Sequence, residues 1–190
     1  MNRREAIKRL SLLMGGAVIG AETFLSGGVL AGKRTTYTPT PDELALLDEI
    51  GETIIPATAS PGAKAVGIGA FMRMMANDCY DDAHQAVFAT AAGRTDSAAK
   101  EKFGKGFLHC SAAERTSLLN GLDKEARQHP AGGPVHYFLL LKQLTLLGYF
   151  TSETGCTQAL RYVETPGAFR GNEPYKRGDR AWFVPPGRNL

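Results

Sequence analysis

Apolar residues recur every three or four positions along most of this chain, which is the pattern of amphipathic helices. The first such stripe consists of Leu44, Leu47, Ile50 and Ile54, and it ends before Pro56. Further apolar stretches follow, and we expect helices over residues 66–80, 82–103, 112–126 and 135–147, with a shorter one over 151–162. No alternation of apolar and polar residues is long enough to predict a sheet, so the pattern indicates an all-α protein.

Two of the expected helices begin with a capping box. Thr40 precedes Pro41, a residue suited to the first helical position, and Glu43 follows three positions after the threonine. Ser111 and Glu114 repeat the same spacing before the fourth helix. In each pair the hydroxyl and the carboxylate satisfy free backbone N–H groups, so both helix starts are well defined.

Two segments carry more apolar surface than an ordinary helix or tail. Residues 135–147 are apolar on nearly every side apart from Lys142 and Gln143, which is typical of a helix in a core or an interface. From Pro166 onward, prolines and glycines interrupt regular structure, yet the segment contains the aromatic residues Phe169, Tyr175, Trp182 and Phe183. Because disordered tails are poor in aromatic residues, we expect this arm to lie against a surface, either that of a partner or that of its own bundle.

The predicted architecture is therefore a compact helical bundle with an extended, irregular C-terminal arm. Residues 1–31 have the character of an export signal, residues 32–165 form the helical domain, and residues 166–190 form the arm. A helical part of this length can enclose a single hydrophobic core.

The chain begins with a charged head followed by a short apolar run from Leu10 to Ala21. That run has 12 residues, whereas a membrane-spanning helix needs about 20. The head contains the pair Arg3 and Arg4, followed by Ile7 and Lys8, which fits the twin-arginine signal that exports folded proteins. An ordinary signal for unfolded chains is the alternative. Cleavage after Ala31 would release a periplasmic protein, and an uncleaved signal would leave it tethered to the membrane.

Charge and cysteine content narrow the function further. The chain has 22 Lys and Arg residues against 19 Asp and Glu, and the excess lies mostly in the first nine residues, so the rest lacks the basic surface that nucleic-acid binding needs. Three cysteines, Cys79, Cys110 and Cys156, are few for a disulfide scaffold, and we expect all three to be buried, small apolar side chains. A single disulfide among them remains the alternative.

The residues alone predict no catalytic constellation. The four histidines, His84, His109, His129 and His136, do not have the i, i+4 spacing of a metal pair on one helical face. The sequence Val66-Gly67-Ile68-Gly69 lacks the third glycine and the preceding strand of a dinucleotide-binding loop. We therefore expect no catalytic, cofactor-binding or metal-binding residue in this chain.

Several short motifs, in a fixed order, nevertheless resemble one family. They are Ile54-Ile55-Pro56, Ser60-Pro61-Gly62-Ala63-Lys64, Asn77-Asp78-Cys79-Tyr80, the stretch from Leu146 to Glu153 with Gly155, Ala159-Leu160-Arg161-Tyr162 and Pro166-Gly167-Ala168-Phe169-Arg170-Gly171. Together they resemble the gluconate 2-dehydrogenase subunit 3 family over nearly the whole chain after the signal.

The resemblance implies a small helical subunit without a cofactor of its own. Its expected partners are a large FAD-containing dehydrogenase of the glucose-methanol-choline type, which lacks a signal, the twin-arginine translocase and, in many complexes, a c-type cytochrome. The small subunit is expected to be needed for maturation and export of the flavoprotein. We expect the partner interface to contain Tyr149, Phe150, Tyr162, Phe169, Arg170, Tyr175, Trp182 and Phe183.

Two other functions are compatible with the sequence. The subunit could contribute residues directly to an active site or to electron transfer in the complex. It could also be a free-standing helical binding protein of the periplasm. A neighbouring gene for a large flavoprotein without a signal would argue against the second alternative.

Overall fold

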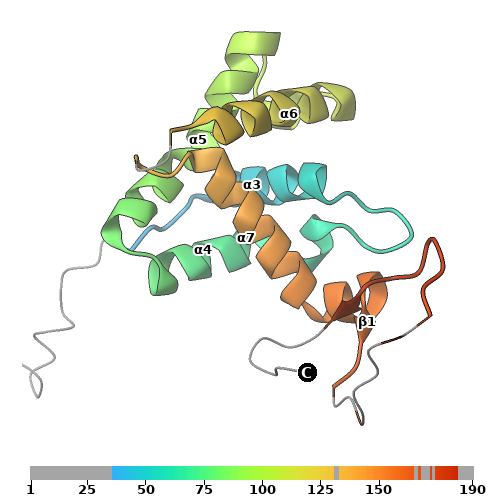
Figure 1. Cartoon of the computed structure of the whole chain (residues 1–190). Helices are drawn as coiled ribbons and strands as arrows, with labels where there is room; N and C mark the ends of the chain where they lie inside the picture. The colour runs from blue at the N-terminus through green and yellow to red at the C-terminus, as the bar shows by residue number, and fades with distance from the viewer. Residues whose placement is uncertain (1–35, 131–132, 165–166, 168–171, 173, 184–190) are drawn as a thin grey trace, which may run out of the picture. The chain divides into compact units, whose positions relative to one another are not determined.

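The computed structural model describes residues 36–130, 133–164, 167, 172 and 174–183 (Figure 1). The predicted export residues Arg3, Arg4, Ile7 and Lys8 and the predicted interface residues Phe169 and Arg170 lie outside this part of the chain. Tyr37–Leu190 forms one compact unit, separate from Met1–Thr36, and only this unit is described below.

The described residues form an almost entirely helical unit, as the sequence predicts. Its elements, in order, are α3 (Pro41–Ile54), the 3-10 turn η1 (Ala63–Val66), α4 (Ile68–Cys79), α5 (Asp82–Phe103), the 3-10 turn η2 (Phe107–His109), α6 (Ala112–Gln128), α7 (Tyr137–Thr151), the π-helical turn η3 (Gly155–Ala159) and the strands β1 (Arg161–Tyr162) and β2 (Trp182–Phe183).

Both predicted capping boxes are confirmed. The Thr40 backbone N–H donates to the Glu43 carboxylate at 2.8 Å, and the Glu43 N–H donates to the Thr40 hydroxyl at 3.2 Å. Ser111 and Glu114 exchange the same two bonds at the start of α6. Each box satisfies two of the N–H groups that a helix start leaves free, so these starts are fixed locally.

Helix α7 is the centre of the core and packs against α3, α4, α5 and α6 (Figure 1). Most of its apolar side chains are buried, among them Leu141 and Leu144. Of the two environments that its sequence allows, core and interface, most of the α7 surface occupies the core, because four helices pack against it. The large apolar side chains that stay exposed on α7 are Leu146, at 38%, and Leu147, at 45%.

The last predicted helix, over 151–162, is shorter than expected. After α7 ends at Thr151, residues 153–159 are helical, the last five of them as the π-helical turn η3, and residues 161–162 are extended. Strand β1 pairs in parallel with β2, with Arg161 opposite Trp182. Two-residue strands are too short to leave an alternating pattern in the sequence, so this pairing could not be predicted from periodicity.

The expectation that all three cysteines are buried is wrong for one of them. Cys110 and Cys156 are buried, as predicted, but Cys79 is exposed at the end of α4, and all three are free. The Cys156 thiol donates to the carbonyl of Phe150 at 3.1 Å, and burial raises the pKa of this thiol.

None of the described helices is long and apolar enough to cross a bilayer.

Candidate functional site

The short motifs that characterise this sequence lie far apart in the chain, and the fold brings two of them together. The Tyr149 hydroxyl donates to the Pro61 carbonyl at 2.7 Å and lies 3.1 Å from the Ser60 hydroxyl. Because its single phenolic hydrogen is directed to Pro61, the Ser60 hydroxyl is the donor of the second bond. The Tyr149 ring is 1% exposed. The tyrosine thus fastens the loop after α3 to the end of α7.

Glycine residues in the same motifs allow close approach of the backbone. A Cβ atom at Gly148 would collide with the side chains of Phe71 and Ile68, where α7 crosses α4. A Cβ atom at Gly155 would collide with the carbonyl of Tyr149, where the chain turns after α7. At these two positions glycine is required by space.

A third motif residue, Asn77, holds the segment that leads into α3. Its side-chain oxygen accepts from the Tyr37 N–H at 2.9 Å, and its amide nitrogen donates to the Tyr37 carbonyl at 3.0 Å. The side-chain nitrogen of Gln85 donates to the carbonyls of Asn77 and Tyr80, each at 3.2 Å. Burial, with a smaller effect of the Glu43 charge, raises the pKa of Tyr37 to about 12. This motif is therefore a structural clamp.

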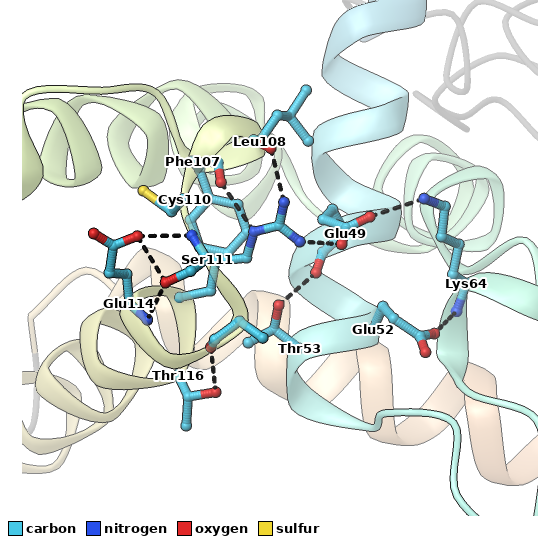
Figure 2. A network of polar contacts seen from close by, with 12 residues as sticks. Glu49, Glu52, Thr53, Lys64, Phe107, Leu108, Cys110, Ser111, Glu114 and Thr116 are labelled. Atoms are coloured by element: carbon cyan, nitrogen blue, oxygen red, sulfur yellow. Dashed lines mark hydrogen bonds and ion pairs between the residues drawn. The ribbon is translucent and has the colours of Figure 1, made fainter.

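A network of polar contacts joins α3, η1, η2 and α6 (Figure 2). Arg115 pairs with Glu49 and donates to the carbonyls of Phe107, at 3.0 Å, and Leu108, at 2.8 Å. Glu49 also accepts from the Lys64 ammonium at 2.8 Å. The pKa of Glu49 is lowered, first by the Lys64 hydrogen bond and then, against the opposing effect of burial, by the Arg115 charge.

The interactions of Glu49 stabilise the fold and do not form an acid–base site. The Glu49 carboxylate is held ionised between two cations, so it has no proton to give and little affinity for one at neutral pH. Next to it, the Glu52 carboxylate accepts from the backbone N–H groups of Ala57 and Lys64, each at 2.9 Å. Its two carboxylate oxygens therefore hold the loop between α3 and η1.

Two grooves in the described part of the molecule are open to solvent. One has a volume of about 540 Å³ and is lined by Thr90, Arg94, Ser97, Glu101 and Tyr137. Another, of about 790 Å³, lies beside α6 and includes Lys102, Ser117 and Lys124. Within the described residues no group of three or more His, Cys, Asp or Glu side chains could hold a metal ion.

The structure separates the predicted interface residues into different environments. Tyr149 is 1% exposed, and its side chain lies inside the core. Phe150 is half-buried against it, with ring centroids 5.2 Å apart. Tyr162, at 46%, Trp182, at 48%, and Tyr175, at 75%, are exposed as a partner contact requires. Phe183 belongs to strand β2.

Charged residues of the C-terminal arm and of β1 attach the arm to the bundle. The Arg180 guanidinium donates to the carbonyls of Thr157, at 3.2 Å, and Gln158, at 2.7 Å. Arg161 forms an ion pair of 3.1 Å with Asp179, and its guanidinium lies 5.2 Å from the Trp182 ring centroid. In the sequence, the cluster of charged residues around Gly178 indicates that the arm can form ion pairs, but it does not indicate which surface those charges contact.

Exposed leucines were also missed. Leu146 and Leu147 are exposed near the C-terminal end of α7, and they precede the segment that carries Tyr162. Their exposure follows from the three-dimensional packing of four helices around α7, which periodicity in an almost wholly apolar segment does not reveal.

Comparison with known proteins agrees with the arrangement of the motifs. The family model for gluconate 2-dehydrogenase subunit 3 matches residues 41–167, from the first residue of α3 to the start of the arm. No curated protein and no solved structure matches the chain significantly. The chain belongs to the gluconate 2-dehydrogenase subunit 3 family.

Proposed function

We propose that this chain is the non-catalytic escort subunit of a periplasmic, FAD-dependent dehydrogenase for a sugar or sugar acid. In this role it binds the folded flavoprotein, which lacks a signal of its own, and carries it through the twin-arginine route. The family is that of a subunit of a dehydrogenase complex, so the chain works together with other subunits.

The observation that carries the proposal is the paired Arg3 and Arg4 at the start of a chain from this family. A twin-arginine signal serves cargo that is already folded, and a subunit that bears one can export a partner that has none. The motif residues support a scaffolding role, since Tyr149, Asn77 and Gly148 all stabilise the fold. Exposed Tyr162, Tyr175 and Trp182 supply the aromatic types that interfaces favour.

The test is to replace Arg3 and Arg4 together by lysine. This change keeps the charge and removes the guanidinium groups, which a receptor reads by geometry. We expect the subunit and its flavoprotein to remain in the cytoplasm together. Arg9→Lys, in the same charged head, is the matched control and should leave export intact. Normal arrival of the flavoprotein in the periplasm in the double variant would contradict the escort role.

An assay of the purified flavoprotein separates the escort role from a direct part in catalysis. The flavoprotein purified alone, folded and loaded with FAD, should oxidise its sugar with an artificial electron acceptor. If it gains activity only when this subunit is added back, the subunit contributes to the reaction itself.

A further inference from the structure

Residues 174–183, which we name the C-terminal strap, lie beyond the segment matched by the family model. None of the side chains of residues 174–182 belongs to the hydrophobic core, and all of them are exposed except Asp179, which is half-buried. These nine residues are therefore attached to the subunit without burial of a core side chain.

The attachments that hold the strap are charged or made by the backbone. Arg180 binds two carbonyls at the end of η3, which a C-terminal turn of helix leaves free. Asp179 accepts from the Lys176 N–H at 2.9 Å and pairs with Arg161. The Arg161 N–H donates to the Ala181 carbonyl at 2.8 Å, next to the β1–β2 pairing.

Contacts of this kind give a segment low local stability. Regions with few buried apolar contacts and solvent-exposed hydrogen bonds open at a lower free energy than the core. The ion pair between Arg161 and Asp179 has side chains that are 32% and 29% exposed, so dissolved salt weakens it, although less than it would weaken a fully exposed pair. The Tyr149–Pro61 hydrogen bond and the Arg115–Glu49 ion pair, which stabilise the helical core, involve no strap residue and do not depend on the strap.

We propose that the strap is a charge-fastened latch that detaches from β1 and η3 while the helical core stays folded. Detachment separates β2 from β1 and exposes the Trp182 side chain more fully to solvent. The latch does not depend on the escort role proposed above.

The full chain contains a single tryptophan, Trp182, so tryptophan fluorescence reports on the strap alone. Trp182 is 48% exposed in the closed strap, and full release should roughly double its quenching by neutral acrylamide. We expect this increase as NaCl is raised, at constant helical circular dichroism. Closure that persists up to the salt concentration at which the helices unfold would overturn the proposal.

Variants assign the effect to the latch. Asp179→Asn and Arg180→Gln each remove a charge and should bring release to lower salt without lowering the melting temperature of the helices. Asp82→Asn, which removes one exposed charge in the first turn of α5, is the matched control and should behave like the unaltered chain. Equal salt curves for all four proteins, or quenching already complete at low salt in the unaltered chain, would contradict a charge-fastened strap.

Discussion

The hydroxyl of Tyr149 donates a hydrogen bond of 2.7 Å to the backbone carbonyl of Pro61, which lies 88 positions earlier in the chain. Both residues belong to motifs by which the family is recognised. The motif around Tyr149 ends α7, and the motif around Pro61 forms the loop after α3. The bond joins the two segments across the core, so part of the family pattern reflects the requirements of the fold.

Tyr149→Phe should therefore destabilise the subunit although it keeps the ring. The Pro61 carbonyl and the Ser60 hydroxyl lose a partner, and an unsatisfied polar group in such a place costs about 1–3 kcal/mol. Urea unfolding followed by circular dichroism measures this loss. Tyr175→Phe, on an exposed tyrosine of the strap, is the control and should be nearly neutral. Equal effects of the two changes would show that the bond contributes nothing.

Gly148→Ala should weaken the crossing of α4 and α7. The added methyl group meets Phe71 and Ile68 in a packed core, and overpacking of this kind costs about 1–3 kcal/mol. Gly93→Ala and Gly121→Ala are helical controls in which the new Cβ has nothing within 4 Å. These two should raise stability, since alanine is favoured over glycine in helices by about 1 kcal/mol. Melting temperatures of the three variants measure these effects. A Gly148→Ala variant that melts at a higher temperature than the unaltered chain would contradict the predicted overpacking.

Much of the helical unit could be predicted because its signals are local. The capping boxes at Thr40 and Ser111 fixed two helix starts, and the stripe from Leu44 to Ile54 fixed α3. Gly67 and Gly104 mark the start of α4 and the end of α5, where both residues have positive φ angles of 67° and 70°. Such features depend on neighbours in the sequence, so they can be identified without the tertiary structure.

The parts that could not be predicted depend on contacts between distant segments. Tyr149 has the aromatic character of an interface residue, and only its bond to Pro61 places it in the core. Arg115 and Glu49 are 66 positions apart and look like ordinary surface charges in the sequence. The fold-back of the strap likewise depends on Arg180 meeting carbonyls 22 and 23 positions earlier.

Arg115→Met should destabilise the junction of α3, η2 and α6. The change removes the hydrogen bonds to the Phe107 and Leu108 carbonyls and leaves Glu49 with Lys64 as its remaining cation. We expect a loss of about 1–3 kcal/mol, as for other hydrogen bonds to charged groups. A double-mutant cycle with Glu49→Gln in urea separates the ion pair from the carbonyl bonds. Strict additivity would show that the pair itself contributes nothing.

Acid should weaken the start of α7 through His136. This residue caps the helix, with its ring Nδ1 atom accepting from the Phe138 N–H at 3.3 Å. Only the neutral ring can accept at that atom. Burial lowers the pKa of His136 below its usual 6.5, and the nearby charges of His129 and Arg94 lower it further, while Glu125 on α6 opposes them.

The sign of the pH effect follows from that shift. The folded chain binds a proton at His136 more weakly than the unfolded chain, so stability is fully present above pH 6.5 and is lost as the pH falls from that value through the lowered pKa of the folded state. Unfolding free energies at about pH 8 and about pH 5.5 measure the loss, in a range where carboxylates titrate little. His136→Asn keeps a side-chain cap that does not titrate and should reduce the pH dependence. His109→Asn, at an exposed position in η2, is the matched control and should retain the dependence of the unaltered chain. An unchanged slope in His136→Asn would show that the acid sensitivity has another origin.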